Sequence, residues 1–250
     1  GVQNAYSLTI TSGSGAATIG GSVSNVTTLA INSQSASSSI SGAIGGSAVL
    51  TYNGAAGYTG INSGVLTLSG ANTSTGGINI NGGTLTVSGS LSDSTTVAVA
   101  AGAIYNLGAS DTIAALTGAG NVTLGASTVT IANAAGTFSG VISGTGNLIL
   151  TAGTQTLAGI NTYTGSTMIN GGTLALTGAG SIATTSGFTN NAIFDISGTT
   201  AGASIIGLAG NNSGNVALGS KTLTITNANN IFAGVISGTG NLILTTGTQT

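Results

Sequence analysis

The stretch GVISGTGNLIL, Gly140–Leu150, recurs unchanged as Gly234–Leu244, at an offset of 94. The identity continues to Thr156 and Thr250 with one difference, Thr246 in place of Ala152. A second duplication shares the core NGGTL, at Asn81–Leu85 and again at Asn170–Leu174, at an offset of 89. Duplication at a nearly fixed period indicates a repeat architecture, in which each unit buries its apolar face against its neighbours. The drift of the offset from 89 to 94 predicts a small insertion around Thr199–Asn212, which we expect to lie in loops.

A shorter period lies within the long one. A small residue is followed by apolar side chains at its +2 and +4 positions, and this alternation is typical of a β-strand. The starting positions of successive units up to Gly172 differ by 18, 19, 19, 18, 26 and 26. The units begin at Gly46, Gly64, Gly83, Gly102, Gly120, Gly146 and Gly172, then at Asn191, Gly214 and Gly240. The sequence therefore predicts an all-β fold, a parallel β-solenoid with coils of about 18–26 residues.

The alternation also predicts side-chain directions and corners. The +2 and +4 residues should point inward, and the residues between them should form outward rows: Thr67, Thr86, Thr123, Ala175 and Ala217. Two more period-two runs, Thr128–Ile131 and Thr222–Thr226, are expected to be further strands of the same coils. Asn53-Gly54, Asn81-Gly82 and Asn170-Gly171 suit corners, where a positive φ is needed. An antiparallel sandwich array and a functional amyloid are the alternative architectures.

Charge is almost absent from the sequence. Charged residues make up 2%, hydrophobic residues 40%, and the net charge is −2, so the composition does not indicate disorder. One Lys and no Arg exclude nucleic acid as a partner. No apolar run approaches the roughly 18 residues of a spanning helix, so the chain is not expected to cross a membrane by itself. A net charge near zero favours association, so we expect self-association into filaments or layers.

The residues offer little chemistry. Apart from Asp93, Asp111, Asp195 and Lys221 the chain has no charged side chain, and it has neither His nor Cys. General acid–base catalysis needs a positioned titratable pair, and the three acids are predicted to lie on different coils. Calcium-binding solenoids carry an Asp in each G-G-x-G-x-D repeat, a pattern missing here. We therefore predict that the chain is not an enzyme, with no catalytic, cofactor-binding or metal-ligating residues and no cofactor.

Two charged residues, Asp195 and Lys221, can each be interpreted in more than one way. Asp195 stands at the +4 position after Asn191, and Asn106 is its equivalent at the offset of 89. A buried polar ladder, a bulge, or an acid turned to solvent at a strand end would each suit that place. Lys221 is interpreted as a solvated loop lysine; an intramolecular isopeptide bond is the alternative, but no partner is marked in the sequence.

The stretch NTYTGSTMINGGTL, Asn161–Leu174, resembles the autotransporter-associated β-strand repeat, whose general form is N-T-Y-T-G-x-T-x-I-x-x-G-T-L. Asn72–Leu85 is a second copy, with Ser74 in place of the Tyr, and Gly57–Leu68 is a degenerate third. The resemblance implies a right-handed β-helix passenger region, exported through the outer membrane and displayed outside a Gram-negative cell. Such passengers usually carry more charge, so an adhesin or toxin role does not follow from the resemblance.

Residues 1–250 are predicted to be a single continuous solenoid segment, with the long repeat covering 72–156 and 161–250. Because Thr250 falls in mid-repeat, we expect the segment to belong to a longer chain. The expected function is that of an extracellular structural protein, a rod, fibre or biofilm-matrix filament at a bacterial cell surface. The alternative is an adhesin stalk that binds surface glycans or host surfaces through exposed aromatics, for which the candidates are Tyr6, Tyr52, Tyr58, Tyr105 and Tyr163. An ice-binding solenoid is a third hypothesis, which the variable coil length disfavours.

Overall fold

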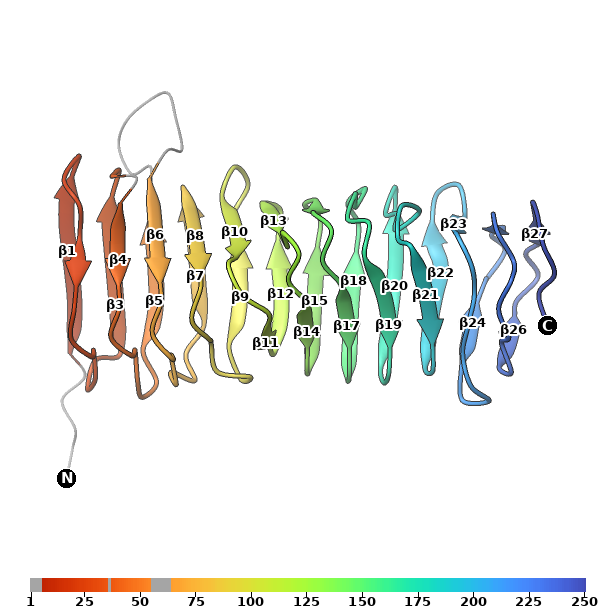
Figure 1. Cartoon of the computed structure of the whole chain (residues 1–250), viewed down its shortest axis with the longest axis horizontal. Helices are drawn as coiled ribbons and strands as arrows, with labels where there is room; N and C mark the ends of the chain where they lie inside the picture. The colour runs from red at the N-terminus through yellow and green to blue at the C-terminus, as the bar shows by residue number, and fades with distance from the viewer. Residues whose placement is uncertain (1–5, 36, 55–63) are drawn as a thin grey trace. The chain divides into compact units, whose positions relative to one another are not determined.

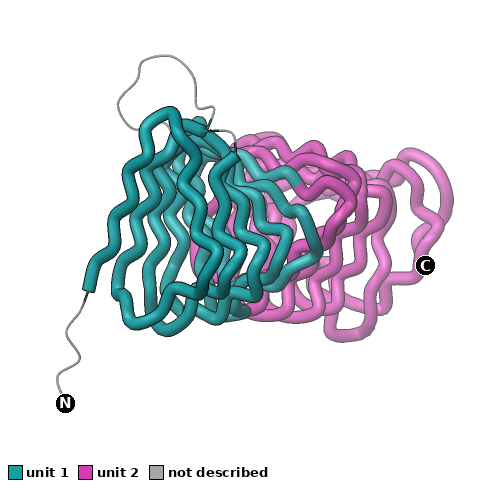
Figure 2. The backbone as a smooth tube through the Cα atoms, turned by 60° about the vertical axis from the view of Figure 1, so that its left-hand side comes forward, with its two compact units in different colours: residues 1–123 teal, residues 124–250 magenta. Residues whose placement is uncertain are grey.

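The computed structural model describes residues 6–35, 37–54 and 64–250. These residues form short strands joined by turns, with no helix among them. The chain divides into two compact units, unit 1 (Gly1–Thr123) and unit 2 (Leu124–Thr250) (Figure 2). Within each unit the pairing is parallel, and successive coils lie side by side (Figure 1). The predicted all-β, parallel β-solenoid is confirmed in both units.

Unit 1 contains two stacks of parallel strands. The first runs through β1 (Ser7–Gly13), β3 (Thr28–Ser33), β5 (Val49–Asn53), β7 (Ile78–Gly82), β9 (Thr96–Val99) and β12 (Ala115–Gly118). The second runs through β2 (Thr18–Ile19), β4 (Ser38–Ile40), β6 (Val65–Leu68), β8 (Thr84–Val87), β10 (Ile104–Leu107) and β13 (Asn121–Thr123). The short β11 (Asp111–Ile113) also belongs to unit 1. Each coil thus contributes one strand to each stack.

Unit 2 contains three stacks. The longest runs through β15 (Ala134–Phe138), β18 (Gly153–Leu157), β20 (Thr173–Gly178), β22 (Ile193–Thr199), β24 (Asn215–Ala217) and β26 (Val235–Ser237). The second is formed by β14 (Val129–Ile131), β17 (Leu148–Leu150), β19 (Ser166–Ile169) and β21 (Gly187–Asn190). The third is formed by β23 (Ala203–Ile205), β25 (Leu223–Ile225) and β27 (Leu242–Leu244), and β16 (Ile142–Ser143) lies outside these stacks. The strands expected at Thr128–Ile131 and Thr222–Thr226 are β14 and β25.

Strand register gives the length of each coil. Between β3 and β5 the register advances by 21, and between β15 and β18 it advances by 19. Between β5 and β7 it advances by 28, as in the pairing of Leu50 with Ile78. The two spacings of 26 in the sequence are not coil lengths, because the glycines that define them precede β13, β17 and β20, which belong to different stacks. The short motif therefore recurs on more than one side of the coil.

The inward and outward assignments hold along most strands. Leu85 and Val87 have no solvent exposure, and Leu148 and Leu150 are 1% exposed. On β6, β8, β10 and β13, Thr67, Thr86, Asn106 and Thr123 align in one outward row. Burial alternates because successive side chains of a strand point to opposite faces of the sheet. Inward apolar side chains therefore stack coil over coil.

Two strands depart from the predicted phase by a single position. Ile104 faces outward while Tyr105 and Leu107 are buried, because the N–H of Ala103 donates to the carbonyl of Ala100 and closes a tight turn. On β22, Ile193 is 39% exposed and the neighbouring Phe194 is buried. Asp195 on β22 is consequently half-buried on the outer face rather than in a buried polar ladder.

The corners and the insertion also differ in detail from the predictions. The positive φ lies on the second glycine of each duplicated corner, 73° at Gly83 and 76° at Gly172, and not on Gly82 or Gly171. A Cβ on Gly83 would lie 2.6 Å from the carbonyl oxygen of Gly64, so coil stacking leaves no space there for a side chain. The stretch Thr199–Asn212 is not all loop, because it contains β23.

Candidate functional site

The residues with the most specific environment are those of the two copies of the repeat. In unit 1 the copy begins at Asn72 and continues through β7, the Gly83 corner and β8. In unit 2 it begins at Asn161 and continues through β19, the Gly172 corner and β20. Each copy therefore places an asparagine in the loop before a strand, and a left-handed glycine at the corner after that strand.

Asn161 joins three successive coils. Its Oδ1 accepts a hydrogen bond of 3.0 Å from the backbone N–H of Ile142 in the preceding coil. Its Nδ2 donates to the carbonyl of Gly159 in its own coil, at 3.1 Å, and to that of Ser181 in the next coil, at 3.0 Å. The residue is 2% exposed. An amide side chain provides both an acceptor and two donors, so one buried residue satisfies three backbone groups.

Asn72 makes the same three contacts in unit 1. Its Oδ1 accepts from the N–H of Ile44 at 3.0 Å, and its Nδ2 donates to the carbonyls of Gly70 and Ser90, each at 3.1 Å. It is 6% exposed. Both asparagines stand at the first position of the repeat motif, from which sequence alone predicted no role for them. Their recurrence at the first motif position, at the offset of 89, was the available signal.

The second position after each asparagine is buried in both copies but is chemically different. The Oγ of Ser74 donates to the carbonyl of Ala48 at 2.7 Å. Tyr163 is fully buried, and its hydroxyl shares a 2.5 Å hydrogen bond with Oγ1 of Thr167. Burial raises the pKa of the Tyr163 hydroxyl, and the hydrogen bond to Thr167 opposes that shift. Both side chains thus complete the interior of the coil.

The aromatic candidates for an adhesin surface lie mostly in the core. Tyr52, Tyr105 and Tyr163 have no solvent exposure, whereas Tyr6 is 59% exposed. Tyr58 and the start of the third motif copy, Gly57–Gly60, lie outside the described residues. Burial raises the pKa of Tyr52 to about 12 and raises that of Tyr105 further.

Asp111 is the acid with the most unusual environment, although the sequence pattern pointed to Asp195. Asp111 is 9% exposed, and its carboxylate accepts from the N–H of Leu91 at 3.1 and 3.3 Å. Burial raises its pKa to about 6; backbone N–H groups of Leu91 and Thr112 oppose the shift, and the charge of Asp93 adds to it. The carboxylate is thus engaged with the backbone rather than directed toward a substrate.

The carboxylate of Asp195 is engaged locally, since it accepts a hydrogen bond from the backbone N–H of Ser197 at 2.8 Å. The backbone N–H of Lys221 donates to the carbonyl of Leu218. Among the described residues no group of three or more His, Cys, Asp or Glu is arranged to hold a metal ion. In the same part of the chain, no helix has the length and apolar character to cross a membrane.

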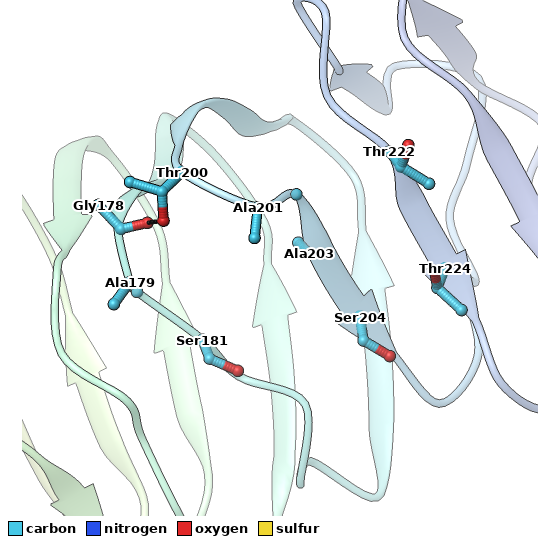
Figure 3. A pocket seen from close by; sticks show the side chains of 11 residues that line it. Gly178, Ala179, Ser181, Thr200, Ala201, Ala203, Ser204, Thr222 and Thr224 are labelled. Atoms are coloured by element: carbon cyan, nitrogen blue, oxygen red, sulfur yellow. Dashed lines mark hydrogen bonds between the residues drawn. The ribbon is translucent and has the colours of Figure 1, made fainter.

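A surface hollow of about 400 Å³ lies in unit 2. Figure 3 shows small side chains around it, and Oγ1 of Thr200 donates to the carbonyl of Gly178 at 3.0 Å. Hydroxyl groups of Ser204, Thr222 and Thr224 contribute to its lining. The residues that line the hollow include no ionisable side chain, so it offers neutral hydrogen bonds but no acid, base or nucleophile with a paired base.

Comparison with known families adds one match. The model of the passenger-associated transport repeat matches residues 61–87 and 152–176, which contain the two motif copies. Searches of curated proteins and of solved structures returned no match. The matched segments hold both asparagines and the two left-handed glycines. These two repeats, set in parallel β-solenoid units, fit an autotransporter passenger β-helix, a class of secreted or cell-surface proteins.

Proposed function

We propose that this chain is a structural segment of an extracellular passenger, providing length and mechanical continuity in a rod, fibre or matrix filament at a bacterial surface. One observation carries the proposal. The polar residues that distinguish the repeat are used between coils: Asn72 and Asn161 bond three coils each, and Ser74 and Tyr163 complete the interior. A repeat built in this way maintains the stack and leaves none of these groups for a ligand.

The outer surface supports a passive role and self-association. Its rows are neutral, as in Thr67, Thr86, Asn106 and Thr123, and successive members lie about 4.8 Å apart. Neutral rows lack the charges that normally oppose contact between copies. We propose on the same grounds that the chain is not an enzyme, that its partners are copies of itself, and that it comes from a Gram-negative cell surface.

Electron microscopy of the native material tests this function. Filaments or layers with a strand spacing of about 4.8 Å along the axis are the expected result. Isolated projections that bind a cell surface or glycan saturably, without lateral or end-to-end association, would overturn it. Assays of glycan hydrolysis and lyase activity on the same material provide the test of the non-enzymatic assignment, and turnover in either would contradict it.

The adhesin is a second candidate because of the hollow in unit 2. Its hydroxyl lining could exchange neutral hydrogen bonds with sugar hydroxyls, as at Thr200 and Ser204. A glycan array probed with the chain and with a Ser204→Val variant separates the two functions. Binding that the substitution abolishes would favour the adhesin, and absence of binding at millimolar glycan favours the structural role.

A further inference from the structure

The stacking of coils in unit 2 is interrupted at the coil that carries β23. This coil bonds to the preceding one through the N–H of Thr200, which donates to the carbonyl of Gly178 at 2.8 Å. Further along the chain the N–H of Ala209 donates to the carbonyl of Phe188 at 2.9 Å. Across the described residues between these two bonds, no hydrogen bond joins the two coils. Because both coils are described, this gap lies inside the fold.

The strand β23 is consequently paired along one edge only. The N–H of Ala203 donates to the carbonyl of Thr222, and the carbonyl of Ile205 accepts from the N–H of Thr226. In a parallel ladder the N–H and carbonyl of one residue point to the same side, and those of the next residue point to the opposite side. The N–H and carbonyl of Ser204 therefore point away from β25 and toward the preceding coil, where no described residue bonds them.

The strand β16 shows that a neighbouring coil can satisfy a strand edge without adding a strand. The N–H groups of Thr162 and Tyr163 both donate to the carbonyl of Ile142. The N–H of Ile142 donates in turn to Oδ1 of Asn161, at 3.0 Å. Both backbone groups of this edge residue are thus bonded by the adjacent coil, whereas those of Ser204 are left open.

The hollow of about 400 Å³ lies at this open edge (Figure 3). Its lining on the two coils is mostly glycine and alanine, which lets a main chain approach closely: Gly178, Ala179, Gly180, Ala201 and Gly202. No lining residue is ionisable, so a charged side chain placed here would lose water without gaining an ionic partner. The space therefore suits a segment with small, uncharged side chains.

We propose that the open edge of β23, with the hollow beside it, binds a short extended polypeptide segment that has small, uncharged side chains. The segment adds a strand to β23: one of its carbonyls accepts from the N–H of Ser204, and one of its N–H groups donates to the carbonyl of Ser204. A peptide backbone presents this acceptor and donor at the distance of a neighbouring strand, about 4.8 Å, and this match favours a peptide over a sugar. The inference goes beyond the proposed function and does not depend on it.

Titration of the capped peptide acetyl-TATAT-amide into the chain tests the proposal. The expected result is saturable binding together with slower hydrogen exchange at the amide of Ser204. The same peptide with its backbone nitrogens methylated keeps the side chains and loses every main-chain donor. It should bind at least about fivefold more weakly, because the carbonyl of Ser204 then gains no hydrogen bond.

Three chain variants locate the contact, and circular dichroism of each checks folding. Ser204→Val removes the hydroxyl but keeps the N–H and carbonyl, so it should bind the peptide within about twofold of the parent chain. Ala179→Phe fills the hollow from an exposed position and should abolish binding. Ala135→Phe makes the same change at an exposed position of β15 outside the hollow and should bind normally.

Three results would overturn the proposal. The first is absence of peptide binding, and the second is binding that leaves the exchange of the Ser204 amide unchanged. The third is loss of peptide binding in a folded Ser204→Val variant, which would show that the ligand is recognised by the hydroxyl. Glycan binding that the same variant abolishes would then assign the hollow to a sugar instead.

Discussion

The two copies of the repeat, Asn72–Val87 in unit 1 and Asn161–Leu176 in unit 2, agree at the asparagine and differ two residues later. Asn72 and Asn161 each bond one N–H and two carbonyls, with all six distances at 3.0–3.1 Å. Ser74 bonds a backbone carbonyl, whereas Tyr163 fills the core and bonds Thr167. The asparagine satisfies backbone groups, which both coils present in the same way. The second residue fills the interior, whose volume differs between the two coils.

A small cavity supports this distinction. In unit 1 a space of about 10 Å³ lies among Asn72, Ser74 and apolar neighbours such as Ile44 and Leu50. That is close to the volume of a single water probe. The coil beneath this copy is the longer one, because its register advances by 28, against 19 for the coil beneath the second copy. A small space therefore adjoins the serine copy, and substitutions in both copies test how far they are equivalent.

Replacing the corner glycine should have the largest effect on stability, and the effect should be the same in both copies. Gly172→Val combines a positive φ with a Cβ that would collide with the carbonyl oxygen of Gly153. The left-handed conformation and the overpacking together are expected to cost about 3–5 kcal/mol of unfolding free energy. Gly83→Val should cost a similar amount, because its φ and its close approach to Gly64 match. Denaturant titration followed by circular dichroism measures both variants.

Gly187→Ala is the control for this prediction. An added Cβ at Gly187 meets no heavy atom within 4 Å. Its unfolding free energy should change by less than about 1 kcal/mol. A corner variant that is as stable as Gly187→Ala would show that the coils can shift to accept a side chain, and that the glycine corner is not what fixes the stacking.

Replacing the asparagines should have the second largest effect on stability, again equal in the two copies. Asn161→Ala leaves the N–H of Ile142 and the carbonyls of Gly159 and Ser181 without this partner, so we expect a loss of about 2–4 kcal/mol. Asn72→Ala should give the same loss within about 1 kcal/mol. Hydrogen exchange at the amides of Ile142 and Ile44 reports each site separately from global unfolding. A much smaller loss at Asn72 would mean that the adjacent cavity admits water to the freed groups.

Much of this fold follows from the sequence, and the exceptions have local causes. Period-two alternation predicted the inward Leu85 and Val87 and the outward Thr67, because a strand offers no other arrangement. The prediction failed at Ile104. The turn before this strand, closed by the hydrogen bond from the N–H of Ala103 to the carbonyl of Ala100, shifts the inward positions by one residue. The prediction counted positions from Gly102 and so placed Ile104 and Asn106 inside, whereas the observed phase buries the two apolar side chains of Tyr105 and Leu107.

The site was harder to predict than the fold. The duplication of Asn72 and Asn161 was visible, but asparagine at a loop position is also typical of turns. The burial of these residues depends on the coils before and after, which sequence spacing places only approximately. The same holds for Asp111, whose buried environment comes from Leu91 in a neighbouring coil. Polar residues that act between coils are therefore identified by register, and not by their own sequence context.

Asp111 can be compared with the two asparagines, because its carboxylate accepts a hydrogen bond from a backbone N–H of another coil, as their side-chain amide oxygens do. Burial raises the pKa of the Asp111 carboxyl to about 6 in the folded chain, whereas in the unfolded chain the pKa of an Asp carboxyl is about 4. Stability should therefore be highest below pH 4 and fall as the pH rises from about 4 to about 6. Allowing for partial solvent screening, the loss is about 1–2 kcal/mol.

Asp111→Asn should remove this pH dependence and stabilise the chain at pH 7 by a similar amount. Thermal melts between pH 3.5 and 8 measure the effect. Asp195→Asn is the matched control, since it makes the same substitution at an acid that is half-buried on the outer face. A parent chain that becomes more stable between pH 4 and 6 would contradict the assigned environment of Asp111.

The second motif position should show the smallest effect and the clearest difference between the copies. Tyr163→Phe keeps the ring in the core and removes a buried hydroxyl contact with Thr167, so we expect a loss of about 1 kcal/mol. Ser74→Ala removes the bond to the carbonyl of Ala48, but the adjacent space of about 10 Å³ could hold one water that replaces it. We therefore expect Ser74→Ala to cost about half as much, measured by denaturant titration of both variants. A loss at Ser74 that exceeds the loss at Tyr163 would show that the serine, like the asparagine before it, serves the backbone rather than the interior volume.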